Sequence, residues 1–196
     1  NDKSSCWVRV AQSGASGGFG SILIPRVGDE VVVVFLDGNP DRPLIMGSLY
    51  NSQNMPPWSL PANKTQSGFL TRSIKGKGSN ANFFRFEDKT GAEQISLHAE
   101  RNLDTEIEAD ESHMVGGNRE IKVDGKHTET IKLETSIAVT EGSYYVTVDS
   151  GEVKINAATS ITLQVGASKL VMKADGTITL SGVTVDVTGS TKVNLN

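Results

Sequence analysis

The sequence is poor in the side chains that usually build a large core. Of its 196 residues, only 37% are hydrophobic and 6% are aromatic. A globular domain of this length would normally bury a larger apolar share, so something other than a big private core must hold the fold. Cys6 is the single cysteine. It excludes an intrachain disulfide and favours a reducing compartment.

A basic surface, a membrane span and a secretion signal are also lacking. The net charge of -4 and the isoelectric point near 5.4 argue against nucleic acid and anionic membranes as partners. The longest apolar run, residues 31–36, is far too short to span a bilayer. No basic start followed by an apolar region marks a signal peptide. Because the chain opens at Asn1 without Met, we expect a C-terminal fragment of a longer protein.

The first fifty residues alternate short β-prone runs with Gly, Asn, Asp and Pro, which is typical of a small barrel. We expect strands at 6–10, 21–24, 30–36 and 44–46. The segment 37–43 (DGNPDRP) combines glycine with two prolines, so it predicts a hairpin with a rigid, polar tip. Residues 51–81 show neither a helical nor a strand period, and we expect a surface connector there. The predicted domains are therefore 1–50, 51–81 and 82–196.

From residue 82 onward the dominant period is eight. Stepping by eight gives Ile107, Val115, Val123, Ile131, Val139, Thr147, Ile155 and Leu163, of which only Thr147 is not aliphatic. Two residues earlier, on the same side of a strand, lie Ile121, Ile137, Tyr145, Val153 and Ile161. The register slips by one near Gly166, after which Leu170, Met172, Ile178, Leu180, Val183, Val185, Val187, Val193 and Leu195 continue the pattern.

An octad is too short for a solenoid made by one chain, which needs about 20 or more residues per coil. If three identical chains each supply one octad, about 24 residues close a triangular turn. The aliphatic side chains then point to the shared axis, and each strand pairs with strands of the neighbouring chains. The period therefore predicts a trimeric, triple-stranded β-helix. Its structural core would be Ile107, Val115, Val123, Ile131, Val139, Ile155 and Leu163.

Charged residues are dense between 81 and 135 and sparse after 166, where Thr, Ser, Val and Gly replace them. A weakly charged end costs less to push through an apolar layer than a densely charged one. We therefore hypothesise that the C-terminal end of the β-helix is a penetrating tip. Lysines placed at outward threonines near this end should impair penetration if the hypothesis is correct.

Polar candidates for a site are few. His113 and Glu129 precede Val115 and Ile131 by two, so they fall on the inward side, where threefold symmetry would gather three copies. Such a ring could hold water or an ion, and like charges there would favour the neutral forms. The remaining histidines, the acidic run 106–111 and the glycine-rich segment 14–20 are interpreted as structural or solvated. The sequence predicts no catalytic site, no cofactor and no resident metal.

Five segments together resemble a known family. They are residues 26–33 (RVGDEVVV), 38–43 (GNPDRP), 51–57 (NSQNMPP), 64–68 (KTQSG) and 86–91 (FEDKTG). In this order they are similar to VgrG, the spike protein of bacterial type VI secretion, and the resemblance covers essentially the whole chain. It implies an OB-like barrel followed by the β-helix. The family's large N-terminal region and first barrel strand have no counterpart here, so the barrel is expected to be incomplete.

The resemblance also implies a function and a set of partners. A VgrG-like homotrimer would sit on a tube of Hcp rings through its missing N-terminal region and carry a PAAR-repeat protein at its C-terminal tip. It would carry effectors and pass through a target membrane after assembly in the bacterial cytoplasm. The related phage spike has a lysozyme domain between barrel and β-helix. Residues 50–81 leave no room for one, so cell-wall hydrolysis is not implied.

Two other interpretations stay open from the residues. A phage tail spike or fibre segment would share the rod, and a polysaccharide-active β-helix enzyme would share the strands. The enzyme would need clustered carboxylates and aromatic platforms for sugars, whereas only Tyr144 and Tyr145 are aromatic after Phe86. A non-catalytic spike therefore remains the leading prediction.

Overall fold

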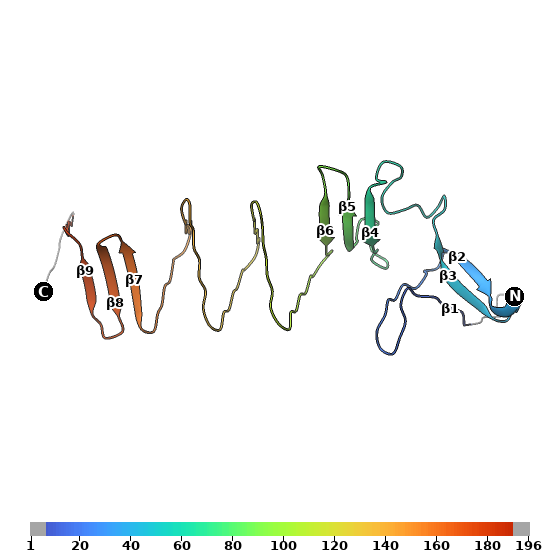
Figure 1. Cartoon of the computed structure of the whole chain (residues 1–196), viewed down its shortest axis with the longest axis horizontal. Helices are drawn as coiled ribbons and strands as arrows, with labels where there is room; N and C mark the ends of the chain where they lie inside the picture. Colours follow the sequence, from blue (N-terminus) through green and yellow to red (C-terminus); the bar gives the residue numbers. More distant parts are fainter. Residues whose placement is uncertain (1–6, 190–196) are drawn as a thin grey trace. The chain divides into compact units, whose positions relative to one another are not determined.

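The computed structural model describes residues 7–189, and nearly all of them are extended or in turns (Figure 1). The chain divides into two compact units, Asn1–Gly117 and Asn118–Asn196, which are described separately below. Within residues 7–189 the one helical element is a single 3-10 turn, η1 (Leu36–Gly38). The predicted all-β class is confirmed. Cys6, Val193 and Leu195, which the sequence analysis assigned to strands, lie outside the described residues.

The first sheet has three strands in the order β1-β3-β2. β1 (Arg9–Val10) pairs parallel with β3 (Pro43–Leu49), and β2 (Glu30–Phe35) pairs antiparallel with β3. Four consecutive valines favour the extended β2 because branched side chains fit a pleated surface. A bulge between Val32 and Val33 shifts the register within this strand.

The turn between β2 and β3 confirms the predicted hairpin with a polar tip. Asp37 takes a left-handed conformation (φ 55°) inside η1, and its carboxylate pairs with the Arg42 guanidinium at 2.5 Å. The Asp41 amide donates to the side-chain oxygen of Asn39 at 2.9 Å, which is an Asx turn. The two side-chain interactions fix a loop that has little apolar contact of its own.

The prediction of a strand at 21–24 was wrong, because this segment pairs with no strand of the described chain. The side-chain amide of Gln12 takes the positions that a neighbouring strand would fill. Its Oε1 accepts from the Leu23 N–H at 2.9 Å, and its Nε2 donates to the Leu23 carbonyl at 3.2 Å. An isolated bridge between Ala15 and Gly20 closes the adjoining loop. Local side-chain bonds thus replace the expected sheet ladder.

The second sheet is an antiparallel meander of β4 (Gln66–Leu70), β5 (Phe83–Glu87) and β6 (Gln94–His98). β4 lies inside the segment that was expected to be a connector without strands, so that expectation needs correction. Its glycine, read as a break, is a requirement of the pairing: Gly68 has φ 141°, and a Cβ there would collide with the Phe84 carbonyl. The proposed boundaries at 50 and 81 stay predictions.

A clasp of polar groups closes the end of this sheet. The Glu100 carboxylate accepts hydrogen bonds from the Asn80 side-chain amide and from the Ala81 N–H, the latter at 3.1 Å. The Glu100 N–H in turn donates to the side-chain oxygen of Asn82 at 2.8 Å. The hydrogen bond from Asn80 and then that from Ala81 lower the pKa of Glu100. Ala81 is the one hydrophobic residue that is buried among the described residues.

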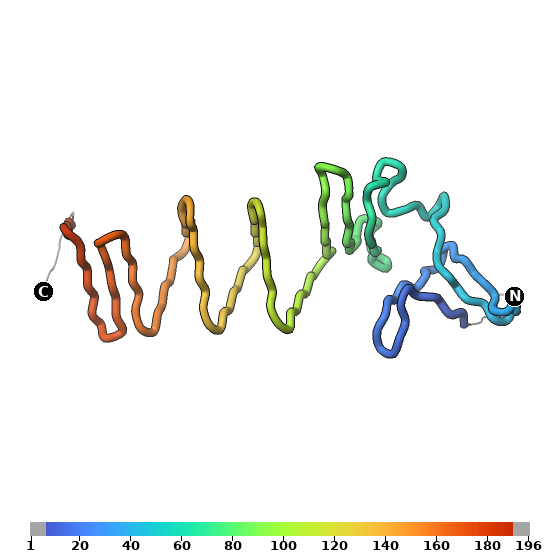
Figure 2. The backbone as a smooth tube through the Cα atoms, in the orientation of Figure 1, coloured from blue at the N-terminus to red at the C-terminus, as the bar shows by residue number. Residues whose placement is uncertain are grey.

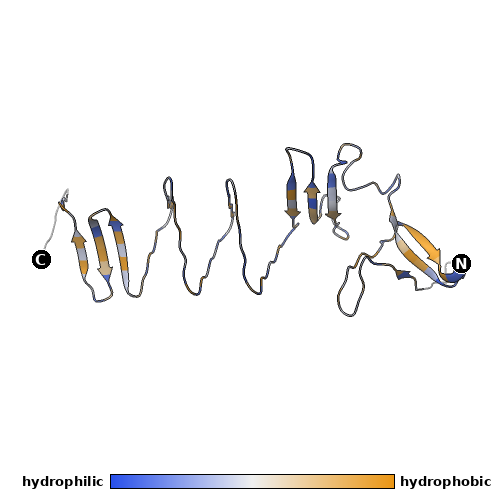
Figure 3. Ribbon diagram, viewed as in Figure 1, coloured by the Kyte–Doolittle hydropathy of each residue, from blue (hydrophilic) through white to orange (hydrophobic). Residues whose placement is uncertain are grey.

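The third sheet lies in the second unit and consists of β7 (Ser160–Val165), β8 (Ser168–Lys173) and β9 (Ile178–Ser181). All three strands pair antiparallel within one chain. The expectation that each strand pairs with strands of the neighbouring chains is therefore wrong for β8, which pairs on both edges within its own chain. Two-residue and longer turns that contain Gly166 and Gly176, both with positive φ, let the chain fold back on itself. Figure 3 shows hydrophobic residues on all three strands.

Candidate functional site

The octad repeat appears in the backbone as a regular series of bends. In the first unit, bends lie at 108–109 and 116–117. In the second unit they lie at 124–125, 132–133, 140–142, 149–151 and 158–159, and the tube runs back and forth between them (Figure 2). Up to the bend at 140–142, each extended segment together with its bend corresponds to one octad. The sequence period thus corresponds to straight backbone segments of similar length.

These straight segments have no strand partner in their own chain. No residue between 101 and 159, all of which the structure describes, belongs to a paired strand. Extended backbone carries one donor and one acceptor per residue, and such groups need partners once water is excluded. In the third sheet the same kind of segment does find partners within the chain. The 101–159 segments therefore present open edges to another chain.

The aliphatic residue just before each bend is only half covered. Ile107 and Val115 in the first unit are 45% and 53% exposed, and Val123, Ile131 and Val139 in the second unit are 46–47% exposed. We call these residues and their counterparts the pre-bend positions. A single chain therefore leaves a large part of each of these side chains in water, at a cost that burial against further chains would remove.

The register differs from the prediction beyond Val139. The bends at 140–142 and 149–151 each have three residues, and Gly142 and Gly151 supply positive φ angles of 98° and 124° there. Val148 consequently takes the pre-bend position that strict spacing assigns to Thr147, and it is 46% exposed. Tyr145, predicted to point inward, is 85% exposed. The slip begins at Gly142, earlier than the predicted slip near Gly166, which instead lies in the β7–β8 turn.

The third sheet has one strongly apolar face. Cross-strand partners share a face of a sheet, and the registers join Ile161 to Met172 and Leu163 to Leu170, then Leu170 to Leu180 and Met172 to Ile178. Leu163, Leu180 and Ile178 remain 56–70% exposed in the single chain. Six large apolar side chains thus share one face, of which Ile161, Leu170 and Met172 are half-buried and the other three are exposed in the single chain. Sequence spacing found all six as three same-side pairs but did not predict that the pairs form one face of a sheet within the chain.

Two ion pairs lie on the side of their segments opposite to the aliphatic residues of the repeat. Lys122 pairs with Asp124 at 3.6 Å, and Lys154 pairs with Glu152 at 2.5 Å. Both pairs alternate with inward aliphatic positions of the same segments, and all four side chains are largely exposed. Exposed ion pairs of this kind contribute little stability. They keep the outer side of the repeat soluble.

The predicted inward candidates His113 and Glu129 belong to the first and the second unit, respectively. His113 Nε2 lies 2.7 Å from the Glu111 carboxylate, two residues earlier and therefore on the same side of the segment. Glu129 follows His127 at the same spacing in the second unit. Among residues 7–189 of a single chain, no three His, Cys, Asp or Glu gather where a metal could be held. An ion on the axis stays a prediction.

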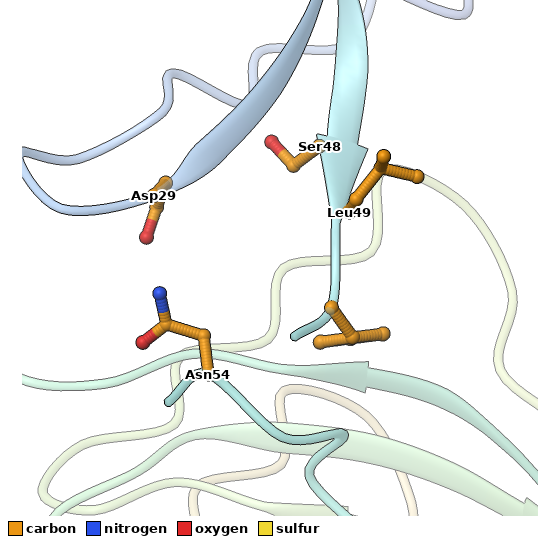
Figure 4. A pocket seen from close by; sticks show the side chains of 5 residues that line it. Asp29, Ser48, Leu49 and Asn54 are labelled. Atoms are coloured by element: carbon orange, nitrogen blue, oxygen red, sulfur yellow. The ribbon is translucent and has the colours of Figure 1, made fainter. Parts of the chain in front are cut away.

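The first unit has a pocket of about 230 Å³ beside β3 (Figure 4). Its lining comprises Asp29, Ser48, Leu49, Tyr50 and Asn54. The polar groups serve the backbone: Asp29 accepts from the Arg26 N–H at 2.7 Å, and Asn54 donates to the Gly28 carbonyl at 3.0 Å. The lining contains no histidine, lysine or cysteine that could activate Ser48 as a nucleophile. The pocket is a product of turn geometry.

The chain matches two family models. The bacteriophage T4 gp5 C-terminal trimerisation domain matches residues 67–180, which is more than half of the chain. This chain belongs to the gp5 trimerisation-domain family. The type VI secretion system/phage-baseplate injector OB domain matches residues 1–50. An OB domain followed by a β-helix of the gp5 kind is the fold class that the sequence predicted, and it is confirmed.

Individual relatives of this gp5-type chain are spike proteins. The type VI secretion system spike protein VgrG1a of Pseudomonas aeruginosa is 42% identical over the whole chain, which covers 32% of that protein. VgrG1c of the same organism is 56% identical over 63% of the chain and 17% of its own length. The actin cross-linking toxin VgrG1 of Vibrio cholerae is 41% identical over 81% of the chain and 14% of its own length. The predicted resemblance to VgrG is confirmed.

The chain thus spans less than a third of the length of these relatives. Among the described residues, no helix has the length and apolar run that crossing a membrane requires. The feature that recurs along the described repeats is a row of half-exposed aliphatic side chains on segments without a strand partner in their own chain. Sequence reasoning missed Val148 within this feature, although the extra residues around Gly142 and Gly151 signal the shift.

Proposed function

We propose that the chain is the non-catalytic, trimeric spike segment of a type VI secretion apparatus. The observation that carries the proposal is the row of half-exposed pre-bend aliphatics on segments that lack a partner in their own chain. Two further copies would cover these side chains and pair the open backbone at once. The match to a trimerisation domain over 67–180 supports a homotrimer.

The spike would act mechanically. In this proposal it carries effectors, bears a PAAR-repeat protein at its C-terminal end and connects to an Hcp tube through an N-terminal region of the longer protein. It assembles in the bacterial cytoplasm and is delivered through a target membrane. The names of the relatives support this assignment, and one relative is named a toxin. In this proposal the function depends on the repeated strands and not on a catalytic site. Residues 1–50 form the OB-like part, and residues 82–196 form the β-helix.

Solution mass provides the direct test of the trimer. Light scattering coupled to gel filtration should give three times the 20.9 kDa of the chain. Intertwined strands separate only by unthreading, so the trimer should also resist detergent at temperatures that dissociate ordinary oligomers. A monomer of 20.9 kDa, with the pre-bend aliphatics exposed to water, would refute the proposal.

Delivery tests the spike function separately. We would place residues 1–196 in the corresponding part of VgrG1a of Pseudomonas aeruginosa and measure secretion of the chimera and killing of competitor cells. Activity near that of VgrG1a supports the spike. The phage descriptions of both family models keep a phage tail spike as a second candidate. A chimera that forms trimers but is neither secreted nor active would favour this alternative.

A further inference from the structure

Repetition creates a problem for three chains that must align. If one chain slips by eight residues against its neighbours, the pre-bend aliphatics between Ile107 and Val139, which are spaced by eight, still meet other aliphatics. Ile131, for example, would lie level with Val123 or Val139 of the next chain, and these residues have nearly equal exposure in the single chain. The pre-bend positions therefore stabilise association but do not specify which octads meet.

The residues two before the pre-bend positions behave differently. In successive octads this middle position holds Thr105, His113, Ile121, Glu129 and Ile137. From His113 to Ile137 it alternates between polar and aliphatic side chains, and Thr105 before them is also polar, whereas every pre-bend position of the same octads is aliphatic. A slip by one octad would bring a polar middle residue level with an isoleucine.

We propose that His113 and Glu129, each with an acid or imidazole neighbour two residues earlier, are the register key of the trimer. This inference rests on the proposed homotrimer. It assigns the two residues to the selection of one alignment of identical chains, and it requires no bound ion. The occupant that the key recognises is the same level of a second and third copy of this chain.

The structure shows how such a level would satisfy its polar groups. Within one chain, His113 Nε2 already lies 2.7 Å from the Glu111 carboxylate. His127 and Glu129 repeat the acid–imidazole spacing in reverse order within the second unit. In an aligned trimer each such level would contain three carboxylates and three imidazoles, so every acid has a base or donor beside it.

A slipped trimer loses this compensation. Glu129 of one chain would lie level with Ile121 or Ile137 of the next, and His113 would lie level with Ile121 or Thr105. A carboxylate or imidazole against aliphatic side chains cannot replace the water that it gives up, and this penalty is large. A single polar residue at an interior position of a coiled coil selects register by the same means.

The test counts alignments directly. In the 196-residue chain, Cys6→Ser removes the native thiol and Ser136→Cys adds one on the outward parity, where a trifluoromethyl label is attached. An aligned threefold trimer gives one fluorine resonance, and a slipped trimer gives several. The test variant combines His113→Ile with Glu129→Ile. Thr130→Ile is the matched control, since it makes the same kind of change on the opposite side of the segment.

We expect one fluorine resonance for the parent and for the control, and several for the test variant. The fraction of slipped trimers in the test variant should rise at least about tenfold, while its thermal stability does not fall. Adding Ile137→Glu to the test variant moves the key by one octad and should restore one resonance. Trimers with one resonance in the test variant, or several in the parent, the control or the moved-key chain, would overturn the inference. Loss of the parent trimer would instead overturn the proposed function.

Discussion

Val123 and Val139 offer a quantitative test of the shared core, because both lie at pre-bend positions of the second unit and are 47% and 46% exposed in the single chain. Complete burial of a valine stabilises by about 1.5–3 kcal/mol, so covering the remaining half contributes about 1 kcal/mol per copy. Six copies in a trimer would contribute about 4–9 kcal/mol. Replacing both residues by Asp removes this term and gathers carboxylates that repel each other and lack partners.

The assay compares detergent resistance and solution mass of the parent and of Val123→Asp/Val139→Asp. The variant should run as a monomer in detergent at room temperature and give a mass well below that of the trimer in buffer. Thr128→Asp/Thr130→Asp is the matched control, because it places two carboxylates on the outward side of a neighbouring segment. A double valine variant that forms a fully resistant trimer would refute the packing scheme.

Three further predictions concern single positions. Val148→Asp should weaken the trimer strongly in the same detergent assay, whereas Thr147→Asp should change it little, because Val148 holds the pre-bend position. A larger loss of detergent resistance in Thr147→Asp than in Val148→Asp would instead support the strict eight-residue register. Gly68→Val should destabilise the second sheet by about 2 kcal/mol or more in denaturant titrations, since its φ of 141° and the Phe84 carbonyl leave no room for a Cβ. Acid should loosen the same sheet: hydrogen bonds lower the folded-state pKa of Glu100, so its contribution is present above the unfolded pKa and is lost as pH falls through the folded value. Glu100→Gln should therefore reduce the loss of stability as the pH falls below 4.5, the ordinary pKa of a glutamate, and an unchanged acid profile would contradict this account.

Much of the fold could be predicted from the sequence because two strong local signals carry it. The β-branched run before the DGNPDRP segment defined β2, the turn and the start of β3. The period of eight located the straight segments up to Val139 without any structural information, because each aliphatic marks the end of one segment. The assignment of the seven core residues to a shared axis stays a prediction.

The features that sequence reasoning missed depend on particular nonlocal or irregular geometry. Gln12 satisfies both backbone groups of Leu23, and no propensity scale anticipates a side chain that replaces a strand. β4 was hidden because Gly68, needed for close approach to Phe84, looks like a break in isolation. The apolar face of β7–β9 depends on antiparallel pairing within the chain, which the octad spacing alone does not distinguish from pairing between chains.

The displaced register also explains what the repeat must preserve. A bend can absorb an extra residue when glycine supplies a positive φ, as at Gly142 and Gly151, without changing the straight segments on either side. An extra residue inside a straight segment would instead turn every following side chain to the opposite face. Both insertions in this chain lie in bends, and the residue before the second of them is again a half-exposed aliphatic, Val148. From Ile107 to Val148 the repeat therefore keeps a large aliphatic side chain at the end of each segment, although the spacing changes from eight to nine residues. The next segment ends at Ala157, and its large aliphatic Ile155 lies two residues before that end.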